Sequence, residues 1–224
     1  QYTVMNDYLG RACGILSSGK MEQRILLLNP TTTGFLVARE DEDGFLFRGK
    51  PINNPPMADF IDTMQYLTDE QWDFDFGDEF TMARHAKVNG KQLELREQHY
   101  DVVIVSGDMQ NMLSSTVELI KDCQKNGIAV VALGTPGNYV DGLEKPEVFA
   151  KLAKGWQSLP SLDALGNFLT TTIGKRIESS NDWLRGVSHM RRVMPDGTEA
   201  IFFVNHHLGR FETTLTLKGN SVEQ

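Results

Sequence analysis

Three short runs of consecutive apolar residues constrain the fold of this chain more than any other feature. They lie within Arg24–Pro30, Tyr100–Ser106 and Ile128–Leu133 and read ILLL, VVIV and IAVVAL. A run of this kind is typical of a parallel strand that is buried on both faces, because a strand with one face in water alternates apolar and polar residues. The sequence therefore predicts a parallel β-sheet.

A helix is predicted between the second and third runs. Val117, Ile120 and Cys123 recur at helical spacing, and Asn126-Gly127 supplies a C-terminal stop. Ser114-Ser115 is predicted to cap the N-terminus, with Glu118 near the capping-box position. A strand, a helix and a strand of these lengths form a right-handed βαβ unit, so the predicted fold class is α/β, with helices flanking the parallel sheet.

Shorter patterns predict the remaining elements of the first 174 residues. Asn89-Gly90 predicts the turn of a β-hairpin over residues 86–95, and most of residues 31–54 is expected to form an irregular insertion. A strand is predicted over 71–76, because Trp72, Phe74 and Phe76 alternate with acidic residues. Helical spacing predicts helices over residues 2–19 (ended by Gly19), 57–67, 78–84, 147–153 and 161–170, the last with Ser161 near its start.

The pattern becomes β-rich near residue 175. Three strands are predicted over residues 185–193, 197–207 and 210–218, with Pro195-Asp196-Gly197 as the turn between the first two. We expect residues 1–174 to form the α/β domain and residues 175–224 to begin a β-sandwich-like region. Because the chain starts at Gln1 and stops soon after a strand-like run, we expect it to be part of a longer polypeptide.

The charge and the cysteines exclude several classes of protein. The net charge of −8, with 30 acidic and 22 basic residues, argues against a nucleic-acid partner, and Arg191-Arg192 is too short to be a basic patch. No apolar run approaches the roughly 18 residues of a membrane span. Cys13 and Cys123 form neither a disulfide framework nor a metal motif, and both are expected to be small buried hydrophobic residues.

Ser106 is the one candidate nucleophile at the end of a predicted strand, where α/β proteins place functional loops. The GxSxG pattern of a nucleophile elbow is absent, so a plain turn is the competing interpretation. Gly134-Thr135-Pro136-Gly137 follows the third run but lacks the spacing of a phosphate-binding loop. Cys123 falls inside a helix, whereas an amidotransferase-like nucleophile stands at a strand-to-helix turn.

The acidic residues and histidines likewise predict no catalytic or metal site. Asp73 and Asp75 lie near Asp78 and Glu79, and two such carboxylates could serve a glycosidase, but the same alternation is typical of an exposed sheet edge. The acidic run over 40–44 is interpreted as a solvated loop. His85, His99 and His206-His207 do not form a metal set. We therefore predict no catalytic residue, no cofactor and no metal ligand.

Taken in order, nine short segments resemble the C-terminal accessory region of α-L-rhamnosidase-like glycoside hydrolases. The resemblance covers nearly the whole chain, and the order of the segments carries it rather than any one of them. The segments are Asp7–Arg11, Leu16–Lys20, Ile25–Pro30, Trp72–Asp75, Tyr100–Val105, Gly127–Val131, His189–Arg192, Asp196-Gly197 and Phe202–Asn205.

The resemblance implies a flavodoxin- or class I glutamine amidotransferase-like α/β domain followed by β-sandwich strands. It also implies that the catalytic carboxylates belong to a barrel upstream in the same polypeptide, because a barrel needs about 200–250 residues of its own. The chain is then a non-catalytic accessory module of a secreted glycoside hydrolase that acts on plant or host polysaccharide, in the periplasm or outside the cell. His189, Arg191 and Asn205 would be interface or fold-stabilising residues.

Two other functions stay open at this point. A carbohydrate-binding module would need exposed aromatic side chains on one face, for which Trp156, Trp183 and Phe211 are the candidates. An independent hydrolase would need a nucleophile at a strand exit, for which Ser106 is the candidate.

Overall fold

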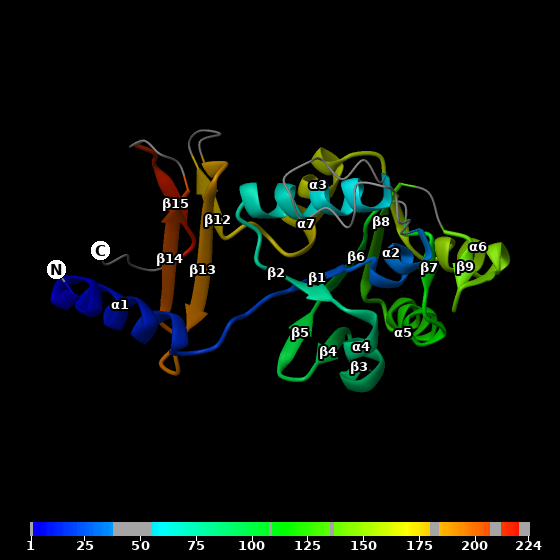
Figure 1. Ribbon diagram of the computed structural model, residues 1–224, viewed down its shortest axis with the longest axis horizontal. Coiled ribbons are helices and arrows are strands. Elements are labelled where there is room, and N and C mark those ends of the chain that lie inside the picture. Colours follow the sequence, from blue (N-terminus) through cyan, green and yellow to red (C-terminus); the bar gives the residue numbers. More distant parts are fainter. Residues whose placement is uncertain are drawn as a thin grey trace. The chain divides into compact units, whose positions relative to one another are not determined.

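The computed structural model describes residues 2–37, 55–107, 109–134, 137–179, 184–206 and 212–219 (Figure 1). The chain divides into two compact units. The first, here called the α/β unit, comprises Arg24–Tyr66 and Phe74–Gly174. The second, here called the β-rich unit, comprises Gln1–Gln23, Leu67–Asp73 and Lys175–Gln224.

The centre of the α/β unit is a five-stranded parallel sheet. Its strands are β1 (Ile25–Leu28), β2 (Phe74–Gly77), β6 (Val102–Val105), β8 (Ala129–Leu133) and β11 (Gln157–Leu159). They lie in the spatial order β2-β1-β6-β8-β11, and every neighbouring pair is parallel. Numbered along the chain this is the order 2-1-3-4-5 of flavodoxin-like sheets. The predicted α/β fold with a parallel sheet is confirmed.

Helices cover both faces of this sheet, which explains the apolar runs. All residues of β1 and β6 are buried. Alternate side chains of the strands share one core with residues of α5 (Ser114–Lys125) and α6 (Pro146–Ala153). Figure 1 shows α3 (Pro55–Asp69) and α7 (Leu162–Thr172) on the side of the sheet opposite α5. A strand covered on both faces needs apolar residues at every position, and β1 and β6 have them.

Two segments near the first two strands differ in part from the predictions. Thr31–Val37 form helix α2, within a segment 31–54 of which most was predicted to be irregular; residues 38–54 lie outside the described part of the chain. Strand β2 begins at Phe74 rather than at residue 71, and only its last residue is buried. The predicted helix near 78–84 is confirmed as α4 (Glu79–His85), and the Asp78 carboxylate caps it by accepting from the Thr81 N–H.

Helix α5 is capped differently from the prediction. Its N-cap residue is Leu113, which contributes no side-chain hydrogen bond, and Glu118 instead pairs with Lys121. The N–H of Ser114 donates to the Asp141 carboxylate over 2.9 Å. Because a distant carboxylate serves this end of the helix, the local capping box is not used. At α7, by contrast, the predicted N-terminal residue Ser161 is the cap and accepts from the Ala164 N–H.

Two small sheets complete the α/β unit. The predicted hairpin over 86–95 is confirmed, and a third antiparallel strand follows it. The strands of these sheets are β3 (Ala86–Asn89), β4 (Gln92–Leu95) and β5 (Gln98–Tyr100) in the first, and β7 (Asn111–Met112), β9 (Tyr139–Val140) and β10 (Leu143–Glu144) in the second.

Among its described residues, the β-rich unit contains one complete helix and two strand pairs. Helix α1 spans Tyr2–Ser17. The longer pair is the hairpin of β13 (Val187–Val193) and β14 (Glu199–Asn205), and the shorter is β12 (Ile177–Ser179) with β15 (Leu215–Leu217). The third predicted strand therefore pairs with an unpredicted one instead of extending the hairpin. The small core of the unit includes Ile177, Leu184 and Val187.

The β-rich unit also includes residues 1–23 and 67–73. One link is the short bridge in which Lys20 and Val193 exchange backbone hydrogen bonds of 2.8 Å. Whether residues 1–174 fold as an independent domain stays a prediction. Among the described residues, no helix is long and apolar enough to cross a membrane.

Candidate functional site

The strand order of the α/β unit points to one edge of the sheet as the place for a site. In doubly wound folds, ligands bind beyond the carboxyl ends of the strands, where the strand order reverses. Here the reversal lies between β1 and β6. Ser106 follows β6 directly, so the candidate nucleophile named from the sequence does stand at this switch point.

Ser106 itself is poorly equipped for catalysis. Its side chain is 1% exposed, and its hydroxyl has no hydrogen-bond partner among the described residues. The next residue, Gly107, lies so close to helix α3 that an added Cβ would be 2.5 Å from an Asp59 carboxylate oxygen. A serine nucleophile needs a base within about 3 Å of its hydroxyl. Within the part of the chain that is described, Ser106 has no such base.

A buried polar network fills the neighbouring part of the same edge. Glu79 is fully buried; its carboxylate accepts from the Thr32 hydroxyl and, over 2.7 Å, from the Leu113 N–H. The Thr33 hydroxyl both donates to the backbone carbonyl of Asn111 and accepts from the Asn111 N–H, over 3.1 and 2.9 Å. These groups satisfy one another, as buried polar groups must, and so they tie α2, α4 and β7 together.

Sequence reasoning missed the two threonines of this network. Thr32 and Thr33 fell in the segment predicted to be irregular, and Glu79 was considered only as one of several acidic residues. The signal that could have found them is the pair of hydroxyls directly after an apolar strand that ends in Pro30. Helices often begin at such a position.

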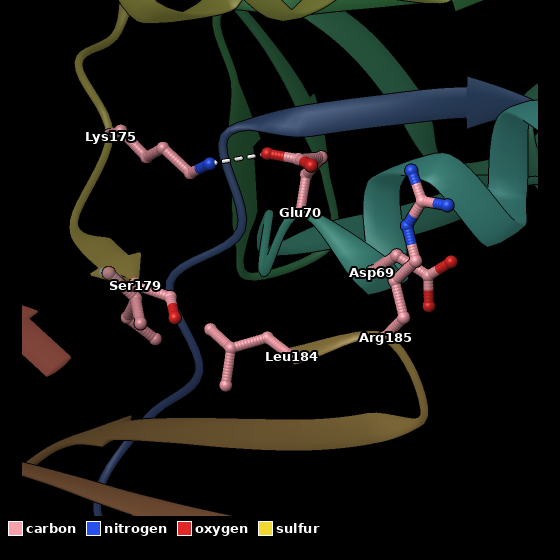
Figure 2. Close-up of a pocket in the computed structure, with 7 residues that line it drawn as sticks. Asp69, Glu70, Lys175, Ser179, Leu184 and Arg185 are labelled. Atoms are coloured by element: carbon pink, nitrogen blue, oxygen red, sulfur yellow. Dashed lines mark hydrogen bonds and ion pairs between the residues drawn. The ribbon is translucent and has the colours of Figure 1, made fainter. Parts of the chain in front are cut away.

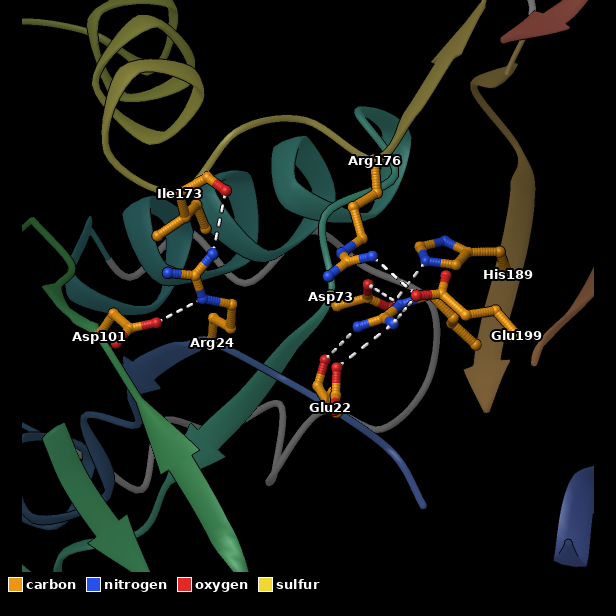
Figure 3. A network of polar contacts seen from close by, with 9 residues as sticks. Glu22, Arg24, Asp73, Asp101, Ile173, Arg176, His189 and Glu199 are labelled. Carbon is orange, nitrogen blue, oxygen red and sulfur yellow. Dashed lines mark hydrogen bonds and ion pairs between the residues drawn. The ribbon is translucent and has the colours of Figure 1, made fainter. Parts of the chain in front are cut away.

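The β-rich unit holds a second polar network, in which Arg191 contacts the Asp73 and Glu199 carboxylates that are labelled in Figure 3. Arg191 is 3% exposed, and its Nε donates to an Asp73 carboxylate oxygen over 3.0 Å. The other oxygen of Asp73 lies 3.0 Å from His189 Nε2. Arg191 also donates to the Glu22 backbone carbonyl over 2.8 Å and lies 3.2 Å from the Glu199 carboxylate. The structure thus brings together His189 and Arg191, which the sequence analysis named as interface or fold-stabilising residues.

The charges in this network reinforce one another. Burial opposes ionisation of Asp73, but the hydrogen bonds and charges of His189 and Arg191 outweigh it and lower the pKa of the carboxyl. Burial also disfavours the charged guanidinium, but the carboxylates of Asp73, Glu199 and Glu22 outweigh that effect and raise the pKa of Arg191. The network is therefore held ionised, which suits a structural ion pair better than proton transfer.

Asp75 does not join Asp73 in a catalytic pair. It lies in strand β2 of the α/β unit and accepts a hydrogen bond of 2.8 Å from the Tyr100 hydroxyl. Burial raises the pKa of Asp75, and the bond from Tyr100 only partly offsets this. Asp73, in the β-rich unit, is engaged by His189 and Arg191. Each carboxylate thus has its own partners, whereas a glycosidase pair faces a shared sugar position.

A polar pocket opens on the β-rich unit (Figure 2). Lys175 lies on one side, where its ammonium donates to the Glu70 carboxylate over 2.6 Å and stands 5.9 Å from the centre of the Trp72 ring. Ile177 and Leu184 supply apolar side chains to the lining of the pocket. The residues that line the pocket are Asp69, Glu70, Lys175, Ile177, Ser179, Leu184 and Arg185.

Trp156 and the two cysteines can be compared with the predictions. Trp156 is 8% exposed and belongs to the core of the α/β unit, so it offers no surface for a sugar ring. Cys13 is exposed, although it was predicted to be buried. Cys123 is buried as predicted, and burial, reinforced by the nearby Asp122 carboxylate, raises the pKa of its thiol to about 12.

The described histidines that were candidates for a metal set have separate surroundings. His85 and His99 are exposed, His99 lies 3.6 Å from Glu94, and the ring of His206 lies 2.9 Å from the Ser188 hydroxyl. No group of three potential metal ligands occurs among the described residues. Asn205 is exposed at the end of β14. Several candidates lie outside the described residues: the acidic run at 40–44, Thr135, Pro136, Trp183, His207 and Phe211.

The chain shares its fold with a known enzyme. No protein-family model matches it, and no curated protein matches it. Its fold is similar to part of a rhamnosidase. One similar structure is the rhamnosidase from Novosphingobium sp. PP1Y, with a TM-score of 0.55 and 13% sequence identity. The match covers 89% of this chain but only 18% of that chain. A likeness at this identity establishes a shared fold.

Proposed function

We propose that this chain is a non-catalytic accessory module of a secreted glycoside hydrolase, joined to an upstream catalytic barrel in the same polypeptide. The observation that carries the proposal is the likeness to the rhamnosidase, which spans nearly all of this chain but less than a fifth of that enzyme. A fold that occupies so small a share of an enzyme is suited to supporting a catalytic domain. The hydrolase would act on plant or host polysaccharide, in the periplasm or outside the cell.

The chemistry of the described residues supports a non-catalytic role. The switch-point edge of the sheet carries a buried serine without a base and a glutamate engaged by Thr32 and Leu113. Asp73 is locked in ion pairs with His189 and Arg191. Catalysis by general acid and base needs groups that can exchange a proton with a substrate, whereas Glu79 and Asp73 are occupied by partners within the protein and Ser106 is buried.

Hydrolysis assays test this proposal. We expect no turnover of aryl glycosides, including an α-L-rhamnoside, by the purified chain, and the same result for Ser106→Ala and Asp75→Asn. The longer polypeptide that includes the barrel is the positive control. Turnover by the chain alone that disappears in either variant would show an active site of its own and overturn the proposal.

A second candidate function is carbohydrate binding, and the pocket of the β-rich unit favours it. The pocket combines carboxylates, cations and the Ser179 hydroxyl with two apolar side chains, a mixture that can hydrogen-bond sugar hydroxyls and cover a ring face. Calorimetry with L-rhamnose and with oligosaccharides would detect this activity. Heat of binding that is lost in Arg185→Ala but kept in Arg84→Ala, an exposed arginine of the α/β unit, would establish this second function.

A further inference from the structure

The polar pocket of the β-rich unit has an ion pair in its wall. Lys175 and Glu70 both line the pocket, and the Lys175 ammonium donates to the Glu70 carboxylate over 2.6 Å. Figure 2 shows this pair on one side of the pocket, with Ser179 and Leu184 across from it. The side chains of Lys175 and Glu70 are 21% and 37% exposed. A charged donor and a charged acceptor therefore stand side by side where a ligand can reach them.

The residue after Glu70 holds the wall of the pocket in place. Gln71 is 3% exposed and has a φ of 56°, a left-handed backbone conformation that is uncommon for a residue other than glycine. Its side-chain amide donates to the backbone carbonyls of Thr68 and Val187 over 2.9 and 2.7 Å. These bonds join the segment that carries Glu70 to the start of strand β13. A conformation of this kind persists where surrounding contacts fix it, and such residues cluster at ligand sites.

The ion pair has hydrogen-bonding capacity left for a ligand. An ammonium has three N–H donors, and a carboxylate can accept about four hydrogen bonds. Within the described part of the chain, the bond to Glu70 uses one of the donors of Lys175. The Trp72 ring, whose centre lies 5.9 Å from the ammonium, adds cation–π attraction without occupying a donor. Lys175 can therefore donate, and Glu70 accept, a further hydrogen bond at the same place.

The charges of the pocket favour a neutral ligand with adjacent hydroxyls. The lining contains two carboxylates and two cations: Asp69, Glu70, Lys175 and Arg185. A ligand with a net charge is attracted by two of these groups, repelled by the other two, and loses its own hydration. A hydroxyl is neutral and can both donate and accept. Adjacent hydroxyl oxygens of a sugar ring lie at about hydrogen-bond distance from one another, as the two groups of the pair do.

We propose that the Glu70–Lys175 pair binds two adjacent hydroxyls of a neutral sugar ring in this pocket. One hydroxyl donates to Glu70, and its neighbour accepts from Lys175. Ile177 and Leu184, which are 1% and 6% exposed, supply apolar contacts for the C–H groups of the ring. This inference rests on carbohydrate binding, the second candidate function above, and adds the ligand class and the residues that recognise it.

Calorimetry of the full chain tests this inference. The neutral probes are L-rhamnose and the methyl glycosides of D-glucose, D-galactose and D-mannose, and the last three are each compared with the uronate of the same sugar. We expect at least one neutral probe to bind, and the corresponding uronate to bind more weakly. Glu70→Ala and Lys175→Ala should each weaken binding about tenfold or more, because each removes a hydrogen bond to a charged group.

A matched ion pair elsewhere in the chain supplies the controls. Lys121 donates to Glu118 over 2.7 Å on the surface of helix α5, in the α/β unit. Glu118→Ala and Lys121→Ala should bind sugar as the wild type does. Glu70→Gln keeps the size of the side chain and an oxygen that can accept from Lys175, so it should fold normally and still bind several-fold more weakly. Circular dichroism verifies that every variant is folded.

The outcomes separate this inference from the functions proposed above. Sugar binding that Arg185→Ala abolishes but Glu70→Ala and Lys175→Ala leave unchanged would keep carbohydrate binding and overturn the role of the pair. Tighter binding of a uronate than of its neutral sugar would overturn the ligand class. If no neutral probe binds, the inference and the second candidate function both fall, whereas the non-catalytic role is tested independently by the turnover assays.

Discussion

Arg191 is a buried charged residue at the centre of the polar network of the β-rich unit. It pairs with Asp73 and Glu199 while only 3% of its surface is exposed. We expect Arg191→Met to reduce the free energy of unfolding by about 3 kcal/mol, because the partly buried Asp73 carboxylate loses its guanidinium partner and keeps only His189. Urea unfolding measures this. Arg192→Met is the control: Arg192 has a single hydrogen bond to the Ser18 carbonyl and should cost about 1 kcal/mol or less.

The same network predicts how stability depends on pH. The pKa of Asp73 is lower in the folded chain than its ordinary value of 3.8. Its contribution is therefore fully present above pH 3.8 and is lost as the pH falls through the lower folded pKa. Urea unfolding at neutral pH and in steps below pH 4 should show the difference between wild type and Asp73→Asn shrinking with acidity. A difference that stays constant would show that Asp73 is not held ionised by its partners.

The two cysteines should differ sharply in reactivity. Cys13 is exposed, whereas Cys123 is buried with a pKa raised to about 12. The thiolate is the reactive form, so a thiol reagent at pH 8 should label Cys13 rapidly and Cys123 only after unfolding. Cys13→Ser should abolish labelling of the native protein, and Cys123→Ser should leave it unchanged. Rapid labelling of the Cys13→Ser variant would contradict the burial of Cys123.

Among the elements, the end of helix α1 depends on a glycine. Gly19 has a φ of 61°, and an added Cβ would clash with the backbone carbonyl of Val193, the bridge partner of Lys20. Gly19→Ala is expected to destabilise the protein by about 1–3 kcal/mol. Gly90→Ala is a matched control, because Gly90 has a φ of 59° with no atom near its Cβ position. Thermal unfolding should show the larger loss for Gly19→Ala, and equal losses would exclude the clash.

The elements differ in how far sequence patterns could predict them. The strands β1, β6 and β8 were predictable because burial on both faces requires apolar residues at consecutive positions. The cap of α5 was not, because the group that serves its N-terminus is Asp141, 27 residues further along the chain. Helix α2 was missed because its sequence, TTTGFLV, has weak helix propensity and owes its form to tertiary contacts of Thr32 and Thr33.

At the scale of the whole molecule, the make-up of the β-rich unit leads to a prediction about truncation. Residues 1–23 and 67–73 belong to the same unit as residues 175–224. A fragment of residues 1–174 therefore lacks the third segment of that unit. In that fragment Asp73 has neither His189 nor Arg191. We expect the parallel sheet to keep its protection from hydrogen exchange, while residues 2–23 and 67–73 lose theirs. Unchanged protection in those segments would instead support an independent domain of residues 1–174.

The sequence by itself determined the fold class, the hairpin turns at Asn89-Gly90 and Asp196-Gly197, and the lack of recognised catalytic motifs. These features depend on neighbouring residues in the sequence. A strand buried on both faces requires consecutive apolar residues, and a tight turn requires turn-forming residues such as Asn-Gly or Asp-Gly. Only the tertiary structure decided the strand order 2-1-3-4-5, the burial of Trp156, and the meeting of Asp73 with His189 and Arg191. Each of these depends on which distant segments pack together, and local periodicity carries no information about that choice.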